Sequence, residues 1–195
     1  MLFHGEFGPG EPLREVTLAE TFHVARSTVR EALHILTGEG LLTRAANRGV
    51  TVTELTERDI AEIFQARLVL ESAGVRAGAA GADLGAPARA LAAYSEAART
   101  DDYLAATHAH LQFHNSLVAL LGNSRLSGQA DVLTGDLRLA LASVERARRN
   151  ARQQVADHRR LLTLMRSGDG AASLAELARH LEAACSSVTV RVTGA

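Results

Sequence analysis

The sequence predicts a mainly α-helical protein in two parts, an N-terminal winged helix-turn-helix and a C-terminal antiparallel, all-α helical bundle. Residues 11–53 contain two short helix patterns followed by two β-type runs. From residue 56 to 186 apolar residues recur at helical spacing, and no strand pattern interrupts them. The chain has 195 residues, of which 47% are hydrophobic and 22% charged, which suits one small and one mid-sized globular domain.

The N-terminal part is predicted element by element from its capping and turn signals. Thr17 and Glu20 have the spacing of a capping box, so a first helix is expected to begin there. A turn at His23 separates it from a second helix over residues 27–38. Residues 41–43 and 50–52 are β-type runs that flank the polar tip Arg44–Gly49, which indicates a hairpin.

The C-terminal part is predicted as consecutive helices separated by glycine-containing breaks. Thr56 can cap a long helix that ends near residue 80, and further helices are expected over 88–99, 102–121, 124–141, 151–166 and 170–186. The last segment alternates like a strand without an obvious partner, so we interpret it as a tail. The expected division is therefore a domain at 1–55, a helical domain at 56–187 and a tail at 188–195.

Composition excludes several classes of protein. No apolar run approaches the ~20 residues that a membrane helix needs, so no membrane partner is expected. The single cysteine, Cys185, excludes an intramolecular disulfide framework and fits a cytoplasmic location. The sequence has no HExxH helix, no recognisable nucleophile triad and no glycine-rich phosphate loop, so an enzyme is not expected. A hydrolytic metal site would need a lone acid such as Glu71 as its base, and nothing singles that residue out.

A nucleic-acid partner is indicated by the positions of individual arginines and not by bulk charge, since the net charge is −1. A recognition helix presents the residues of its first turn to base edges in the major groove. The second predicted helix begins with Arg26, Ser27, Thr28 and Arg30. The hairpin tip carries Arg44, Asn47 and Arg48, with Gly49 for the turn, which suits a wing against DNA. The alternative is that these arginines only solvate a small domain.

Histidines of the helical part have spacings that fit a metal site. His110 and His114 are four residues apart and so project from one helix face, while His158 and His180 lie on two other predicted helices. Facing helices of a bundle can bring such side chains together in the core. His108 is rotated away from that face and is expected at the surface. Spacing alone leaves open whether these are metal ligands or hydrogen-bonded core histidines.

The first part of the chain resembles the DNA-binding domain of GntR-type bacterial transcription regulators. The segment PGEPLREVTLAETFHVARSTVREALHILTGEGLLTRAANRGVTV carries the Pro-Gly, Leu-Ala, Val-x-Arg, Val-Arg-Glu-Ala-Leu, Glu-Gly-Leu and Arg-Gly landmarks of that family in order. The resemblance implies that Arg26, Thr28 and Arg30 contact DNA. It places Asn47, Arg48 and Gly49 in the wing.

The chain departs from this family pattern at four points. Ala25 replaces the usual Ser or Thr, so a helix N-cap is lost. Val16 stands where an Arg often contacts DNA, and His23 replaces the turn glycine. The family's first helix is expected to be truncated, because the Pro-Gly landmark lies close to Met1.

The second part resembles the FadR C-terminal (FCD) ligand domain over roughly residues 58–185. The likeness rests on His110-Leu111-Gln112-Phe113-His114, on Gly122-Asn123, and on His158 and His180 flanking a Ser-Gly-Asp turn. It implies a divalent metal held by His114, His158 and His180, with His110 at the position of the family's Asp. An imidazole in place of that carboxylate favours borderline transition metals over Mg²⁺ or Ca²⁺, and we expect Zn²⁺ or Ni²⁺.

Together the two resemblances imply a ligand-responsive transcription regulator, expected to be a repressor. It would bind a pseudo-palindromic operator in double-stranded DNA as a homodimer, with a small carboxylate effector anchored on the metal. Arg67 and Arg138 are candidate anchors for that carboxylate, although Arg67 could instead form an ordinary helix pair with Glu71. A metal-responsive regulator and a metal-free fatty-acyl binder are the alternative functions.

Overall fold

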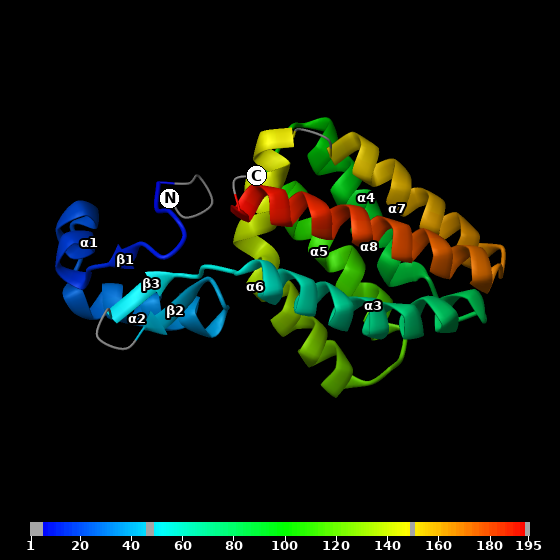
Figure 1. Cartoon of the computed structure of the whole chain (residues 1–195), viewed down its shortest axis with the longest axis horizontal. Helices are drawn as coiled ribbons and strands as arrows, with labels where there is room; N and C mark the ends of the chain where they lie inside the picture. Colours follow the sequence, from blue (N-terminus) through cyan, green and yellow to red (C-terminus); the bar gives the residue numbers. More distant parts are fainter. Residues whose placement is uncertain (1–5, 46–48, 149–150, 194–195) are drawn as a thin grey trace. The chain divides into compact units, whose positions relative to one another are not determined.

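The protein divides into two compact units, Met1–Leu55 and Thr56–Ala195, called here the head and the bundle. The computed structural model describes residues 6–45, 49–148 and 151–193, and Figure 1 shows its helices and strands. The head combines two helices with a small sheet, whereas the described part of the bundle is entirely helical. The mainly α-helical fold class predicted from the sequence is confirmed.

The head is a winged helix-turn-helix. Its elements are β1 (Pro12–Leu13), α1 (Glu15–Phe22), α2 (Arg26–Gly38), β2 (Leu42–Ala45) and β3 (Gly49–Val52). The strands β2 and β3 form the expected antiparallel hairpin, with Leu42 opposite Val52. The strand β1 pairs with the other edge of β3 and was not predicted, because two residues are too few to show an alternating pattern.

The start of α1 differs from the sequence prediction. The helix begins at Glu15, with Arg14 as an N-cap that makes no side-chain capping bond. Thr17 therefore lies inside the helix, and the predicted Thr17–Glu20 capping box is wrong. The earlier start places the Glu15 carboxylate in the first turn, where the helix dipole favours negative charge.

The turn between α1 and α2 is tight and left-handed. His23 adopts φ 54° and ψ 43°, and the N–H groups that cap the helix here bond to the carbonyls of Ala19 and Glu20. A left-handed backbone is disfavoured for a residue with a Cβ, so His23 carries the strain that a glycine would avoid. The missing cap at Ala25 is confirmed, since its side chain makes no bond at the start of α2.

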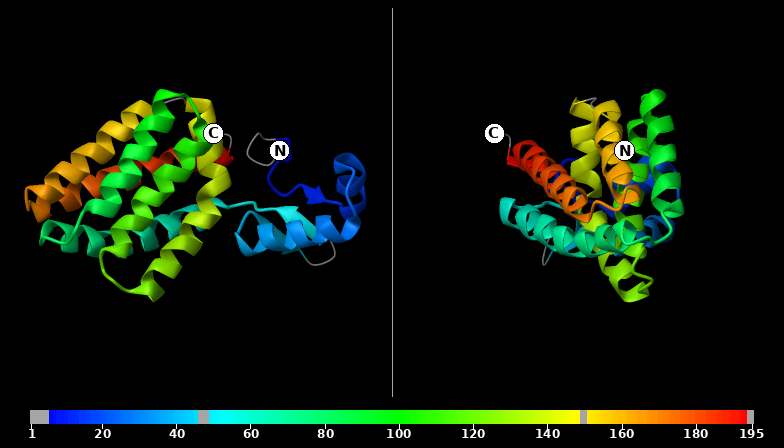
Figure 2. Two further views of the ribbon diagram at one scale, coloured as in Figure 1. Left: turned by 180° about the vertical axis from the view of Figure 1, so that it is seen from behind. Right: turned by 90° about the vertical axis from the view of Figure 1, so that its right-hand side faces the viewer.

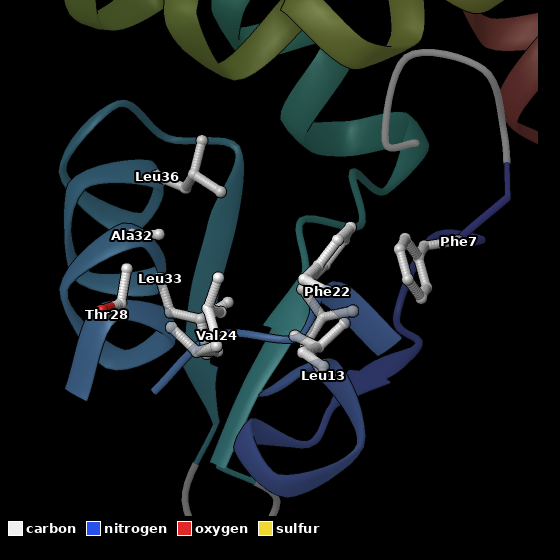
Figure 3. A pocket seen from close by; sticks show the side chains of 10 residues that line it. Phe7, Leu13, Phe22, Val24, Thr28, Ala32, Leu33 and Leu36 are labelled. Carbon is white, nitrogen blue, oxygen red and sulfur yellow. The ribbon is translucent and has the colours of Figure 1, made fainter. Parts of the chain in front are cut away.

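The helices of the head also line an apolar groove of about 430 Å³ (Figure 3). Four of its lining residues, Leu13, Leu18, Val29 and Leu33, are buried. The remaining lining residues are Phe7, Phe22, Val24, Thr28, Ala32 and Leu36. The buried face of α2 thus points toward α1, which leaves the opposite face of α2 for contacts outside the head.

The bundle consists of long helices packed side by side (Figure 2). They are α3 (Glu57–Ala79), α4 (Gly85–Arg99), α5 (Tyr103–Ala119), α6 (Ser124–Arg148), α7 (Ala151–Arg166) and α8 (Gly170–Thr193). The helix α5 packs against α3, α4 and α6, and α8 packs against α3, α6 and α7. No helix in the described part of the chain is long and apolar enough to span a membrane.

The first helix of the bundle is firmly capped. Thr56 and Asp59 form the predicted start as a reciprocal capping box, in which each side chain bonds to the other residue's backbone N–H. Hydrogen bonds from the Thr56 hydroxyl and backbone lower the pKa of the Asp59 carboxyl. Because β3 ends only a few residues earlier, this cap fixes where the chain leaves the wing and enters the bundle.

Two bundle helices extend beyond their predicted C-terminal ends, and α4 begins at Gly85, three residues before its predicted start. The helix α6 continues past Leu141 to Arg148, since no glycine or proline stops it and Val144 is buried. The segment 188–195, predicted as a separate tail, continues α8 as far as Thr193. Val188 is fully buried, so packing overrides the strand propensity of the valines in this segment.

Candidate metal centre and nucleic-acid interface

Four imidazoles converge in the core of the bundle. His110 and His114 come from α5, His158 from α7 and His180 from α8. One ring nitrogen of each lies within 4.8 Å of the corresponding nitrogens of the others. All four residues are between 1% and 5% exposed. The expectation that these side chains meet at one interior point is confirmed.

The local sequence of each helix explains this placement. On α5, His110 and His114 are one turn apart and share a face with Phe113 and Leu117, both fully buried. His158 is flanked on α7 by Val155 and Leu161, and His180 on α8 by Leu177 and Leu181, which are similarly buried. The histidines thus occupy positions on the apolar face of each helix, where burial is decided by packing.

Two of the contacts between the rings join Nε2 atoms. The Nε2 atoms of His158 and His114 are 3.1 Å apart, and those of His180 and His114 are 3.2 Å apart. Two nitrogen ligands of one metal, each about 2.0–2.1 Å from it, are separated by about 2.9–3.4 Å in octahedral or tetrahedral coordination. The observed separations fall within this range, so these nitrogens fit a common metal ion.

Hydrogen bonds at the opposite side of the rings set the tautomers. His114 Nδ1 is 2.6 Å from Glu71 Oε2, and a carboxylate only accepts, so Nδ1–H donates to it. His158 Nδ1–H donates to the carbonyl of Gln154 at 2.5 Å. In the neutral rings the Nε2 atoms of His114 and His158 therefore carry lone pairs, and both point into the cluster.

The electrostatics of the cluster disfavour protonation. Burial lowers the pKa of His114, His158 and His180 well below the usual value, and nearby positive charge lowers it further. Lone pairs that face one another at about 3 Å attract a cation between them. The neutral, converging imidazoles are thus a ready donor set for a divalent transition metal.

A buried ion pair supports the cluster. Arg67 Nε donates to Glu71 Oε1 at 2.8 Å, while Glu71 Oε2 accepts from His114, so the carboxylate bridges a guanidinium and an imidazole. Burial raises the pKa of Glu71, and the charge of Arg67 acts in the opposite direction. Of the two roles predicted for Arg67, the ordinary helix pair with Glu71 is present.

Sequence reasoning missed the role of Glu71. Its partner His114 is 43 residues away, and no local spacing reports a contact between α3 and α5. Tyr94, fully buried on α4, was also missed: its ring stacks on His110 with the centroids 5.2 Å apart and the planes 7° from parallel. A buried tyrosine on an apolar face shows no sequence signal of such stacking.

The structure places the remaining candidates of the bundle at different distances from the four histidines. His108 is exposed on α5, as predicted. Arg138 is half-buried on α6. Arg67 lies close enough to His114 and His180 for its charge to lower the pKa of both.

The predicted DNA-reading residues that the structure describes are exposed on the head. Arg26, Ser27 and Thr28 form the first turn of α2, and Arg30 follows on the same helix. Arg44 is exposed near the end of β2, and Gly49 begins β3 with a φ of 75°. Asn47 and Arg48 lie outside the described residues.

Three of these arginines surround one acid. Arg30 forms a hydrogen-bonded ion pair with Glu15, the first residue of α1. The hydrogen bond from Arg30 lowers the pKa of Glu15, and the charges of Arg30, Arg26 and Arg44 lower it further. The first turn of α2 and the wing strand therefore present their positive charges close together.

Comparison with known families and proteins agrees with both halves of this description. Residues 62–183 match the family described as "FCD domain", and residues 1–52 match the family "Bacterial regulatory proteins, gntR family". The structure of a GntR transcriptional regulator from Rhodococcus sp. RHA1 superposes with a TM-score of 0.80 at 30% sequence identity. That alignment covers 96% of this chain and 91% of the other.

Curated relatives match over shorter stretches. The HTH-type transcriptional regulator YdhC of Bacillus subtilis (strain 168) is 43% identical over 75 residues, which is 38% of this chain and 34% of YdhC. The gluconate operon transcriptional repressor of the same organism is 49% identical over 63 residues, or 32% and 26% of the two chains. The matched stretches thus span about a third of these relatives or less.

Proposed function

The chain belongs to the GntR family of bacterial transcription regulators, in the group that carries an FCD domain, and we propose that it is a repressor whose operator binding responds to a metal-anchored small organic acid. The matched families are transcription regulators and not enzymes. The observation that carries the proposal is the convergence of four buried imidazoles in the effector domain.

The head supplies the DNA-reading half of this function. Arg26, Thr28 and Arg30 address base edges in the major groove, and Ser27 bonds to a base or a phosphate. The wing approaches the backbone or minor groove with Arg44, Asn47, Arg48 and Gly49. A second copy of the chain binds the other half-site of a pseudo-palindromic operator, so the active species is a homodimer.

The bundle supplies the sensing half. His110, His114, His158 and His180 hold a divalent metal, and an all-nitrogen donor set favours Zn²⁺ or Ni²⁺. A metal in this site supplies a Lewis acid to which the oxygen of a small carboxylate can bind. Arg67 is the candidate second anchor, because its ion pair with Glu71 is made through Nε and not through the two terminal nitrogens.

A second candidate function is that the metal itself is the effector. Four imidazole nitrogens satisfy tetrahedral Zn²⁺ without an added ligand, and the arginine best placed to anchor a carboxylate already pairs with Glu71. A metal-free fatty-acyl binder has less support, because it gives no reason for four histidines to converge in the core.

The helix α3 connects the two halves. It starts at the Thr56 cap shortly after the wing strand β3, and further along it Glu71 bonds to His114. An effector that binds one arrangement of α3 more tightly than another can shift operator affinity by up to the difference between its two binding free energies. Such couplings are typically about 1–3 kcal/mol.

Operator binding under controlled metal tests this proposal. A duplex is first selected by the wild-type protein from a randomised library, and its affinity is then measured by fluorescence anisotropy at fixed salt. The conditions are chelator alone, Zn²⁺ alone, and Zn²⁺ with small mono- and dicarboxylates. We expect at least a 5-fold change in Kd on adding effector, which is the lower end of typical allosteric couplings of about 5–150-fold.

Two variants on α5 sharpen the experiment. His114→Ala should abolish the effector response, whereas His108→Ala, which removes an exposed histidine from the same helix, should keep it. A response that needs both Zn²⁺ and a carboxylate supports the organic-acid sensor, and a response to Zn²⁺ alone supports the metal-responsive regulator. If wild type selects no sequence from the library, the repressor proposal is wrong.

A further inference from the structure

The ion pair between Arg30 and Glu15 fixes the plane of a guanidinium on the DNA-reading face. Arg30 Nε lies 3.0 Å from Glu15 Oε1, and Nη2 lies 2.9 Å from Oε2. Both carboxylate oxygens therefore engage one edge of the fork, the edge made of Nε–H and one terminal N–H. Such a bidentate contact restrains orientation as well as distance.

The other edge of the Arg30 guanidinium is the one that can read a base. It consists of the N–H groups of the two terminal nitrogens, at the end of a side chain that is 64% exposed. Two parallel N–H donors match the O6 and N7 acceptors of guanine in the major groove. The carboxylate engages the side of the fork, so donors at its end are left on an exposed side chain.

An acid at this position needs a reason. The hydrogen bond from Arg30 lowers the pKa of Glu15, and the charges of Arg30, Arg26 and Arg44 lower it further, which favours a negative charge on the proposed DNA-facing surface. A negative charge there weakens non-specific attraction to DNA. An exposed ion pair adds little to folding stability, so stability alone does not account for it. An effect of Glu15 on the orientation of the Arg30 guanidinium would account for an acid at this position.

We propose that Glu15 is a positioning residue for sequence recognition, which holds the Arg30 fork side-on so that its free end reads a single guanine in each half-site. The inference rests on the proposed function, in which the first turns of α2 enter the major groove. It gives Glu15 a part in specificity that Glu20, the other acid of α1, does not share.

The test compares specific and non-specific binding of Glu15 variants. The first probe is the duplex that wild type selects from a randomised library. The second is the same duplex with the guanine opposite Arg30 replaced. That guanine is identified as the one whose replacement lowers the affinity of wild type but not that of Arg30→Ala. For Glu15→Gln we expect discrimination between these duplexes to fall about tenfold or more. Affinity for a scrambled duplex should rise or stay constant, because a charge that repels phosphate is removed.

Glu20→Gln is the matched control. Glu20 is an exposed acid on the same helix, and no described ion pair joins it to an arginine. This variant removes the same charge and should leave discrimination within twofold of wild type. Equal loss in both variants would show that net charge, and not the positioning of Arg30, sets the discrimination, and would overturn the proposal.

A double-mutant cycle separates positioning from general damage to the head. Arg30→Lys keeps the charge but removes the fork, so adding Glu15→Gln to it should change discrimination less than twofold. An undiminished effect of Glu15→Gln in that background would contradict the proposal. If wild type enriches no sequence from the library, the proposed function is wrong. If wild type enriches a sequence and Glu15→Gln discriminates the two duplexes as well as wild type does, only the positioning role is wrong.

Discussion

The histidine at position 110 gives the candidate metal centre its chemical character. A metal-bound imidazole is an uncharged ligand, unlike a carboxylate, so a set made of His110, His114, His158 and His180 would leave a bound divalent ion its full charge. The neighbouring Arg67–Glu71 pair adds no net charge. Tyr94 stacks flat on His110, which favours one orientation of the ring that departs from the FCD pattern.

Glu71 should control metal affinity without touching the metal. As the acceptor for His114 Nδ1–H, its carboxylate orients the ring and makes Nε2 a stronger donor. We predict that Glu71→Gln weakens Zn²⁺ binding about 10–100-fold, measured by competition with a chelating dye.

Because Glu71→Gln leaves the buried Arg67 charge without its partner, a second variant is needed. Combining Arg67→Met with Glu71→Gln removes both charges and should preserve folding while showing a similar loss of Zn²⁺ affinity. Glu62→Gln, which removes an exposed acid from the same helix, serves as the control. Wild-type affinity in the double variant would show that Glu71 has no influence on His114.

The backbone strain at His23 can be measured as a change in the free energy of unfolding. It holds a left-handed backbone at the turn between α1 and α2. For a non-glycine residue this conformation costs about 1–2 kcal/mol, part of which glycine would return as unfolded-state entropy. We predict that His23→Gly raises the free energy of unfolding of the head by about 0.5–1 kcal/mol, measured by urea denaturation. A decrease would mean that the imidazole makes a compensating contact.

At the scale of elements, α3 and α5 approach so closely that only glycine fits between them. A Cβ at Gly74 on α3 would come within 1.9 Å of the carbonyl oxygen of Leu117 on α5. This close approach brings Glu71, one turn before Gly74, within hydrogen-bonding distance of His114. The geometry of the metal centre thus depends on a backbone contact as well as on side chains.

Two glycine substitutions should have opposite effects. Gly74→Ala forces α3 away from α5 and should destabilise the bundle by about 3 kcal/mol, as well as weaken Zn²⁺ binding. Gly128 is exposed on α6 with nothing within 4 Å of an added Cβ, so Gly128→Ala should stabilise it by about 0.5–1 kcal/mol through helix propensity. Thermal unfolding measures both, and a stabilising Gly74→Ala would contradict the close packing.

The elements also show where local sequence stops being informative. Thr56 was recognisable as a cap because its bonding partner, Asp59, is three residues away. The ion pair of Glu15 was not recognisable in the sequence, because its partner Arg30 lies on the next helix. The valines of 188–193 favour a strand locally, yet the burial of Val188 makes them part of α8. Predictions failed where contacts between elements outweigh local propensity.

For the whole molecule, the sequence allows the DNA-reading residues and the histidine cluster to be predicted, but not the contacts that connect them. The spacing of His110 and His114 on one helix face predicted a shared ligand, while the meeting of α5, α7 and α8 needed the fold. The connection through α3, from the Thr56 cap to Glu71, joins residues that no motif links. The helix that carries Glu71 therefore begins at the residue where the chain leaves the reading head.

The most direct test of this account is the metal content of the purified chain. Protein prepared without chelators, reconstituted with Zn²⁺ and dialysed, is analysed by inductively coupled plasma mass spectrometry. We predict about one Zn²⁺ per chain in wild type and in His108→Ala, and a loss of most of it in His114→Ala and His158→Ala. Equal metal content in all four proteins, or none in wild type, would contradict the four-histidine centre on which the sensing function depends.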